Sequence, residues 1–380
     1  MEKIIVVGAG LSGATIARLF AEKGDFVTVI DKRNTIGGNV YDEKDKNGIL
    51  VQPYGPHIFH TNEKEVYEFL SQYTEWFKYE HKVLAYIKGK YVPVPFNLTS
   101  LKTLFPEDKA ERIKKVLSDE IGYGKKTPIL SLKKHEKAEI RAFADFVYKN
   151  VFEYYTKKQW NLKPEELGET VMNRVPVYVS REDRYFTDEY QYQPREGFTH
   201  MVENILRHPN VTLKLGQDAM QDITLADGKI YLNGVEFDGK VIYTGCIDEL
   251  FDYKYGVLPY RSLKFKFKTK KTSSYQPSAV VNYTTNKPFT RISEFTKFTC
   301  QPQEKTVICK EYSKKFKKGK NIPYYPIPIQ KNYDHYDKYL SEAVKYPNLY
   351  LLGRLANYKY INMDVAVKNA IELFNKITNE

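Results

Sequence analysis

The chain has 380 residues, of which 42% are hydrophobic and 28% charged, and it carries a formal net charge of +12. A chain of this length and polarity has room for two or three globular domains, and it contains no apolar run of the ~18 residues that a membrane helix requires. Its three cysteines are odd in number and fit no metal-site spacing. They predict a reducing, cytoplasmic setting.

Part of the positive charge lies in one run, KKFKKGK, over residues 314–320. Such a run is usually a solvated loop, but it also suits a nucleic acid, an anionic membrane surface or a doubly charged diphosphate substrate. No nucleic-acid-binding motif accompanies the charge, so we expect no nucleic-acid partner and no membrane insertion. The 32 tyrosines supply flat faces with a hydroxyl, which suit nucleotides and sugars.

The first predicted unit is a strand, a glycine turn and a helix. Apolar, β-favouring residues precede a GxGxxG motif made of Gly8, Gly10 and Gly13, and helix-forming residues follow it. The first glycine permits a tight turn, the second lets a pyrophosphate approach the helix N-terminus, and the third lets the helix pack on the strand. Leu11 and Ser12 belong to the same predicted phosphate-binding turn.

An acidic residue ends the next predicted strand. Asp31 follows the apolar residues 26–30 and lies eighteen residues beyond Gly13. A carboxylate there takes the ribose hydroxyls of an adenosine and disfavours a 2′-phosphate. The Gly37-Gly38 pair that follows resembles chains of the FAD-dependent amine-oxidase type and narrows the predicted dinucleotide to FAD. The predicted cofactor contacts in this segment are Asp31, Lys32, Gly38 and Asn39.

Further elements follow from the spacing of apolar residues. Residues 63–77 have helical spacing, and residues 82–96 alternate like strands. Residues 106–160 are helical in pattern and predict a small helical domain. Residues 171–193 and 258–312 are rich in β-branched and aromatic residues with a period of two, which predicts an antiparallel sheet.

Two later segments return to the nucleotide-binding fold. Residues 240–245 and 349–353 read as buried strands that end in glycine, and a helix is predicted from about Met363. We therefore expect an α/β fold: a discontinuous Rossmann-like FAD-binding domain with an inserted small helical bundle and an antiparallel β-sheet domain. The expected boundaries are 1–80, 195–250 and 340–380 for the FAD-binding domain, 98–168 for the helical domain, and 81–97, 169–194 and 251–339 for the sheet or substrate domain.

Short motifs outside the nucleotide fold carry a resemblance to a known family. In chain order they are YGPHIFHT (54–61), YYTKKQW (154–160), NRVPV (173–177), RYF (184–186), YRSL (260–263), FTRISE (289–294), KEYS (310–313), PYYP (323–326) and GRLANYKYINMD (353–364). Together they closely resemble the bacterial UDP-galactopyranose mutases, from the N-terminus to about residue 370.

The resemblance implies a defined reaction. The family is an isomerase (intramolecular transferase) that converts UDP-galactopyranose to UDP-galactofuranose with no net redox change. It requires reduced FAD, whose N5 is proposed to attack the anomeric carbon. The resemblance also implies a UDP-sugar substrate, an external reductant such as NAD(P)H or another flavin-reducing system, a homodimer, and delivery of the furanose to cell-surface glycans.

By resemblance, two arginines hold the departing diphosphate, whose negative charge grows as the anomeric bond breaks. They are Arg174, in a segment that is mobile in the family, and Arg291. The third catalytic position is His60, beside the isoalloxazine. His57 and His60 also have an HxxH metal spacing, but no third or fourth ligand lies nearby in sequence, so we expect no metal.

The remaining site residues also follow from the resemblance. Without it, Phe152, Tyr155 and Thr156 would read equally as a core stripe on one helical face. The implied substrate-binding residues are His57, Phe152, Tyr155, Thr156, Trp160, Tyr185, Phe186, Arg261, Glu311, Tyr325, Tyr360 and Asn362. The implied additional cofactor residues are His57, Ile58, Gly353, Arg354, Met363 and Asp364.

Three positions depart from the common family pattern. His81 stands where Asn is frequent, Tyr178 where Arg is frequent, and Asn362 where Asp is usual. These departures put the sugar in doubt, and UDP-arabinopyranose or UDP-N-acetylgalactopyranose are the alternatives; His57 favours a sugar without the N-acetyl group. Outside the family, an amine-oxidase-like FAD oxidoreductase and a basic binding protein stay open.

Overall fold

The computed structural model describes residues 1–166, 175–285, 287–299 and 304–379. The chain forms two compact units, each assembled from separate segments. Unit 1 consists of Met1–Lys78, Asp188–Ser262 and Lys315–Glu380. Unit 2 consists of Tyr79–Thr187 and Leu263–Lys314. Each unit is described by itself below.

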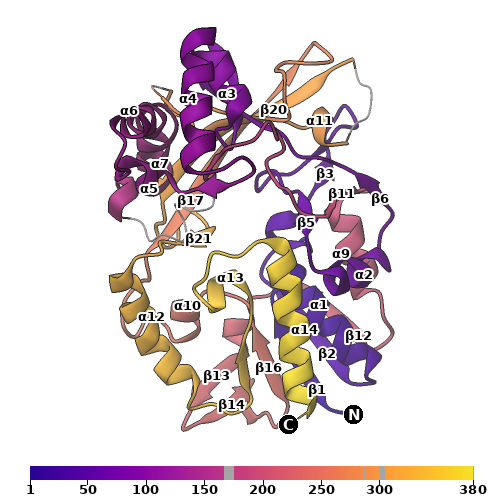
Figure 1. The fold of residues 1–380 in the computed structure, drawn as a ribbon. Helices are drawn as coiled ribbons and strands as arrows, with labels where there is room; N and C mark the ends of the chain where they lie inside the picture. Colours follow the sequence, from indigo (N-terminus) through magenta and orange to yellow (C-terminus); the bar gives the residue numbers. More distant parts are fainter. Residues whose placement is uncertain (167–174, 286, 300–303, 380) are drawn as a thin grey trace. The chain divides into compact units, whose positions relative to one another are not determined.

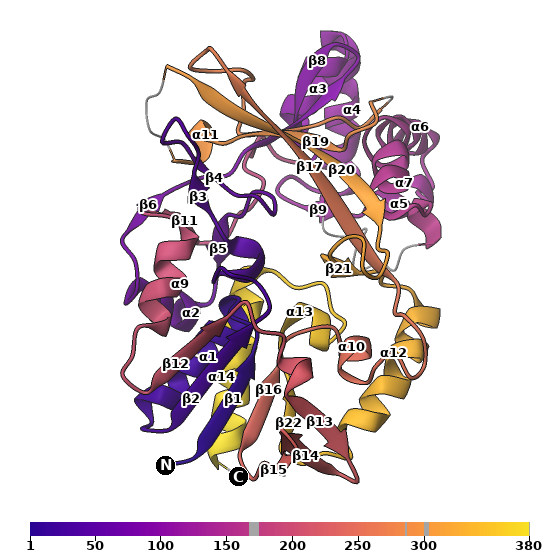
Figure 2. The ribbon, with the colours of Figure 1, turned by 180° about the vertical axis from the view of Figure 1, so that it is seen from behind.

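Unit 1 is built on a five-stranded sheet in which every neighbouring pair is parallel. The order across the sheet is β12 (Val211–Leu215), β2 (Phe26–Asp31), β1 (Lys3–Val7), β16 (Lys240–Tyr243) and β22 (Leu349–Leu351). Figure 2 shows β12, β2, β1 and β16 side by side. Because the strands come from three distant parts of the chain, the predicted discontinuous Rossmann-like domain in an α/β fold is confirmed.

Alternate residues of β1 enter two different cores. Ile4 and Val6 pack on one face against helices, whereas Ile5 packs on the other face against tyrosine-rich segments. A parallel strand buried on both faces is apolar along its buried residues, as β1 is from Ile4 to Val7. The first face is covered by α1 (Leu11–Glu22), α2 (Lys64–Ser71), α9 (Phe198–Leu206) and α14 (Met363–Asn379), and Figure 1 shows α14 beside α1.

The second face of the sheet is covered by short strands and helices and by α12 (Gln330–Ala343). The shorter elements are η4 (Ala219–Gln221), β13 (Ile223–Ala226), β14 (Lys229–Leu232) and α10 (Ile247–Leu250), and β15 (Val235–Glu236) pairs with β14. The rest of unit 1 is η1 (Gly38–Val40), the β3–β4 pair (Glu43–Lys44, Leu50–Val51), the sheet β5–β11–β6 (Phe59–Thr61, Tyr190–Pro194, Trp76–Lys78), β21 (Tyr325–Pro326) and α13 (Gly353–Ala356).

Unit 2 contains most of the second large sheet. The order is β17 (Tyr260–Lys270), β20 (Thr306–Lys315), β19 (Arg291–Glu294), β18 (Val280–Asn282), β7 (Val83–Ile87) and β8 (Lys90–Val94), with the first residues of β17 pairing with β21 inside unit 1. The pairs β18–β19, β19–β20 and β7–β8 are antiparallel, as predicted, whereas β18 and β7 are parallel. That one parallel pair joins a hairpin from residues 83–94 to strands nearly 200 residues later.

Most helices of unit 2 that the structure describes follow one another along the chain. They are α3 (Leu98–Leu104), α4 (Glu107–Glu120), α5 (Ile129–Lys133), α6 (Ala138–Val147) and α7 (Tyr154–Trp160), with β9 (Lys126–Thr127) paired to β10 (Val177–Tyr178) and the short turn η3 (Pro164–Glu166). The short helix α11 (Thr296–Thr299) lies between β19 and β20. A π-helical turn, Tyr148–Glu153, separates α6 from α7. On α6, Ile140, Phe143 and Val147 are buried and form its core-facing side.

The alternation of β-branched and aromatic residues identified strands, but it did not identify the sheet to which each strand belongs. The predicted strand region 171–193 contains β10, in unit 2, and the start of β11, in unit 1. Whether the helices and the sheet of unit 2 are separate domains stays a prediction. Across the described ranges, no helix combines the length and the hydropathy that crossing a bilayer demands.

Candidate functional site

A cavity opens in unit 1 at the carboxyl ends of β1, β2 and β16, where open α/β sheets bind their ligands. It also receives the N-terminal ends of α1, α13 and α14. The predicted cofactor residues that line it are Gly8, Gly10, Leu11, Ser12, Gly13, Asp31, Lys32, Gly38, Asn39, His57, Gly353, Arg354 and Met363. Asn362, predicted for substrate, lines it too, whereas Ile58 and Asp364 do not.

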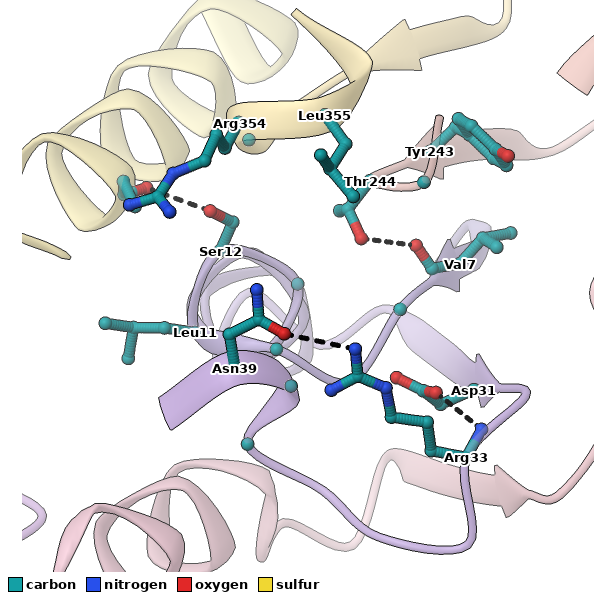
Figure 3. Close-up of a pocket in the computed structure, with 18 of the residues that line it drawn as sticks. Val7, Leu11, Ser12, Asp31, Arg33, Asn39, Tyr243, Thr244, Arg354 and Leu355 are labelled. Carbon is teal, nitrogen blue, oxygen red and sulfur yellow. Dashed lines mark hydrogen bonds between the residues drawn. The ribbon is translucent and has the colours of Figure 1, made fainter. Parts of the chain in front are cut away.

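Glycine shapes the turn between β1 and α1. Gly8 has a φ of +112°, a conformation that residues with a side chain rarely adopt, and a Cβ there would lie 2.0 Å from Thr244 Oγ1. The Thr244 hydroxyl donates to the Val7 carbonyl at 2.7 Å (Figure 3). A Cβ on Gly13 would lie 2.0 Å from the Gly8 carbonyl oxygen. The turn and the helix are therefore in direct main-chain contact.

Of the helices whose N-termini meet the cavity, α1 and α14 are the two longer ones. No side chain caps the start of α1, and its first turn holds no acidic residue. The first N–H groups of a helix lack intrahelical partners, so this end favours an anion such as a pyrophosphate. The Asn362 carbonyl accepts the first bond of α14 from the Ala366 N–H at 3.1 Å. The α14 terminus thus presents a second set of N–H donors to the same cavity.

Main-chain donors hold the Asp31 carboxylate in place. Oδ2 accepts the Ala9 N–H and Oδ1 accepts the Arg33 N–H, both at 2.8 Å. Figure 3 shows the bond from Arg33. Each carboxylate oxygen has two lone pairs, so one on each oxygen stays open to a ribose hydroxyl. The arrangement agrees with the predicted role of this carboxylate.

Arg33 is a cavity residue that the sequence reasoning missed. Its guanidinium lies over the Tyr54 ring at 4.4 Å and donates to Asn39 Oδ1 at 3.1 Å (Figure 3). Its Nη1 is buried and has no hydrogen-bond partner among the described residues. A buried guanidinium nitrogen at a cavity wall fits a bound phosphate or another acceptor. The sequence signal that could have identified Arg33 was its position between Asp31 and the Gly37-Gly38 pair.

Arg354 joins predicted cofactor residues to predicted substrate residues. It donates to the carbonyls of Tyr324 and Ile361, and its guanidinium lies 5.2 Å from the centre of the Tyr360 ring. The rings of Tyr360 and Tyr325 lie 5.3 Å apart. The structure thus brings these aromatic residues to the cofactor cavity's edge within unit 1.

Arg261 lies next to this cluster along the sheet. It pairs with Tyr325 between β17 and β21. Burial lowers the pKa of its guanidinium, but arginine stays charged at any physiological pH.

The two predicted histidines of unit 1 have different surroundings. His57 lines the cavity, and its Nδ1 lies 2.8 Å from the Gly55 carbonyl oxygen. His60, on β5, has Nδ1 2.7 Å from Asp188 Oδ2. Asn62 donates to the other Asp188 oxygen at 2.8 Å. Asp188, which the sequence did not single out, therefore orients the imidazole, and the described ranges hold no acid–thiol–imidazole cluster suited to a metal.

In unit 2 the sheet pairs Arg291 with Glu311. The two residues are opposite each other on β19 and β20, and Arg291 Nε and Nη2 lie 2.8 and 2.7 Å from Glu311 Oε2. Glu311 is only 2% exposed, so the ion pair fixes the guanidinium strongly. Arg174, the other predicted arginine, lies outside the described residues.

The predicted nucleotide-side residues lie on and just before α7. Phe152, in the π-helical turn, is buried, as are Thr156 and Trp160, while Tyr155 is half-buried. Tyr185 and Phe186 are adjacent residues that come later in the chain than α7. They pack around His81, whose ring centroid is 5.8 Å from that of Tyr185 and 5.9 Å from that of Phe186. The structure thus gathers one predicted aromatic pair with a residue that departs from the family pattern.

Comparisons with known proteins agree with this geometry. The family model for UDP-galactopyranose mutase matches residues 150–360, and that for an NAD(P)-binding Rossmann-like domain matches residues 6–73. A dTDP-fucopyranose mutase of Escherichia coli is 36% identical, covering 98% of this chain and 97% of its own length. A probable UDP-galactopyranose mutase of Klebsiella pneumoniae is 35% identical, covering 100% of this chain and 96% of its own.

Solved structures share the fold. The crystal structure of a reduced UDP-galactopyranose mutase superposes with a TM-score of 0.76 at 18% identity, covering 100% of this chain and 96% of that chain. Putrescine oxidase bound to putrescine gives a TM-score of 0.62 at 11% identity, covering 100% and 99%. At these identities the likeness speaks for the fold alone.

Proposed function

This chain belongs to the UDP-galactopyranose mutase family, and on that premise we propose that it interconverts the pyranose and furanose forms of a nucleotide-bound sugar with a reduced flavin. The observation that carries the proposal is the identity of 35–36% with two mutases over nearly the whole of each chain. The reaction is an isomerisation with no net redox change. In sequence, an amine oxidase and an L-amino-acid oxidase match only 24% and 20% of the chain.

We take the cofactor to be FAD. The open α1 N-terminus suits its pyrophosphate, the Asp31 carboxylate suits its ribose, and Arg33 Nη1 lacks a partner among the described residues at the same wall. When bound in reduced form, a flavin supplies a nucleophilic nitrogen for the anomeric carbon. The N–H groups at the start of α14 would stabilise negative charge on the reduced ring. An external reductant, such as NAD(P)H or a flavin-reducing system, would keep it reduced.

On the substrate side, the chain's own charges act on the diphosphate. Arg291, oriented by buried Glu311, would bind the phosphate oxygens as the anomeric bond breaks, together with Arg174. The aromatic residues around α7 would keep the released nucleotide from diffusing away. His60, held by Asp188, would lie against the flavin. These roles rest on the family motifs and on the contacts within each unit.

The sugar and the base are the finer part of the proposal. UDP-galactopyranose is our first assignment, because the family model and the Klebsiella and Mycoplasma genitalium relatives carry that name. The E. coli relative named for dTDP-fucopyranose supports a second candidate, a 6-deoxy sugar on a thymidine nucleotide. UDP-arabinopyranose and UDP-N-acetylgalactopyranose come next.

A panel of nucleotide sugars tests the proposal. Dithionite-reduced enzyme is incubated with UDP-galactofuranose and with dTDP-fucofuranose, and the pyranose products are separated by chromatography. We expect conversion of one of them at a rate that oxidised enzyme does not reach. The absence of conversion of any nucleotide furanose by flavin-loaded, reduced enzyme would refute the mutase assignment. Bleaching of the oxidised flavin by an amine substrate would favour the oxidoreductase instead.

Three further proposals rest on family resemblance and composition. We place the protein in the cytoplasm, because it has only three cysteines, and we propose a homodimer whose product enters cell-surface polysaccharide. Light scattering coupled to gel filtration gives the mass in solution. A mass near the chain's own 44.4 kDa would contradict the dimer.

A further inference from the structure

One half-buried lysine in unit 2 holds a loop through the loop's main chain. Lys158, on α7, directs Nζ to four carbonyl oxygens, those of Tyr283, Thr285, Lys287 and Phe289. The last three lie 3.1, 3.1 and 3.2 Å away. These residues belong to the loop between β18 and β19, and the loop ends one residue before Arg291.

The chemistry of this contact is specific for an ammonium group. Main-chain carbonyl oxygens are strong hydrogen-bond acceptors, and the three N–H bonds of an ammonium can be shared among four of them. Burial lowers the pKa of Lys158 to about 8, so keeping the charge costs free energy. A lysine retained at such a cost has a use in the structure, since an apolar side chain of the same size would avoid it.

The next residue of α7 makes a second connection. The Ser313 hydroxyl donates to the Gln159 carbonyl at 2.7 Å. Ser313 lies on β20, two residues beyond Glu311. Consecutive residues of α7 therefore contact both chain segments that carry the Arg291–Glu311 pair. The same short helix carries Tyr155, Thr156 and Trp160, the proposed nucleotide-side residues.

We infer that Lys158 is a positioning residue, which fixes the distance between the nucleotide-binding face of α7 and the phosphate-binding guanidinium of Arg291. The inference rests on the proposed function. A nucleoside diphosphate would bridge these two places, with its base near α7 and its phosphates at Arg291. Its affinity then depends on a contact that the ligand itself does not touch.

The test compares lysines that are adjacent in sequence. Lys158→Ala removes the ammonium, whereas Lys157→Ala removes an exposed lysine of the same helix and serves as the matched control. UDP and dTDP are titrated against flavin-loaded protein by calorimetry, and kcat and KM are measured separately. We expect Lys158→Ala to bind the wild-type's preferred nucleotide about tenfold more weakly and to raise KM, with flavin content unchanged. Lys157→Ala should behave like wild type.

Chemical rescue distinguishes positioning from general loosening. Ethylammonium or propylammonium should enter the space left in Lys158→Ala and restore nucleotide affinity in a saturable way. Tetramethylammonium has the same charge but no N–H donor and should not. Lys158→Gln, which keeps two N–H donors and most of the volume, is the second variant and should retain part of the affinity. It also serves if Lys158→Ala does not fold.

The outcomes separate this inference from the proposed function. Unchanged nucleotide affinity in folded, flavin-loaded Lys158→Ala or Lys158→Gln would overturn the positioning role while leaving the mutase assignment intact. Equal rescue by tetramethylammonium would also overturn it. If wild-type protein binds neither UDP nor dTDP, the proposed function fails first, and the inference fails with it.

Discussion

The two units build their candidate binding residues by different means. In unit 1 the cavity is shaped by main chain: glycines without room for a Cβ, two helix N-termini, and a carboxylate held by N–H groups. In unit 2 the candidate residues are side chains that hold one another, as Arg291 is held by Glu311 and the preceding loop by Lys158. The first kind of site tolerates side-chain changes and fails when the backbone is displaced. The second fails when one charged group is removed.

The largest effect should follow from filling the main-chain contact in unit 1. In Gly13→Val the new Cβ would meet the Gly8 carbonyl oxygen at 2.0 Å, so α1 must move away from the phosphate-binding turn. We expect the purified protein to be colourless, with no flavin absorbance near 450 nm and no uptake of added FAD. Gly24→Ala is the control, because nothing lies within 4 Å of the Cβ position of Gly24, whose positive φ of +101° is the only cost of adding a side chain there. It should lose about 1 kcal/mol of stability and keep its flavin.

The second largest effect, a loss of turnover, should follow from removing one charged side chain of unit 2. Arg291→Ala should keep FAD and lose turnover by on the order of 10²-fold or more, because the departing diphosphate loses a fixed cation. It also leaves Glu311, which is 2% exposed, without its partner, so the folded fraction must be measured by circular dichroism. Arg291→Lys keeps the charge without the two-nitrogen fork and should recover only part of the rate. Near-normal turnover in Arg291→Ala would remove this residue from the proposed clamp.

The difference between a main-chain site in unit 1 and a side-chain site in unit 2 explains how much of each could be predicted from sequence. The glycine turn, Asp31 and the flanking strands are local signals, and the structure assembles them as expected. Arg33 was missed although it lies within that local segment, because its partner Tyr54 is distant in sequence.

In unit 2 the residues were found through family motifs, and their contacts could not be derived. Lys158 binds carbonyls more than 120 residues away. Because every residue has a main-chain carbonyl, the sequence does not indicate which carbonyls accept a hydrogen bond from this lysine. The π-helical turn of Tyr148–Glu153 was likewise hidden, since its apolar spacing resembles that of an α-helix.

The third prediction concerns pH, which should change nucleotide affinity and the free energy of unfolding in opposite directions. The pKa of Lys158 is lowered to about 8 in the folded protein, against 10.5 in the unfolded chain, so between these values the unfolded state binds more protons. The free energy of unfolding contributed by this group must therefore rise with pH from about 8 toward 10. Nucleotide affinity should fall over the same range, because the neutral amine has fewer donors for the loop carbonyls. Chemical denaturation and calorimetry of wild type and Lys158→Met at pH 7 and 9.5 give both quantities. If affinity and stability change in the same direction relative to Lys158→Met, this account of the loop is wrong.

The smallest effect should come from a charged side chain on the cofactor cavity, where the comparison predicts tolerance. Lys32 lines the cavity and pairs with Glu249 at 2.9 Å, but its side chain is 59% exposed. Such pairs contribute about 0–1 kcal/mol. Lys32→Met should therefore change the dissociation constant for FAD by about fivefold or less, measured by flavin fluorescence on re-addition to apoprotein, with Lys23→Met as an equivalent surface substitution outside the cavity. A loss of flavin as complete as that expected for Gly13→Val would mean that side-chain charge, and not the main chain, holds the cofactor. The contrast between the two units would then disappear.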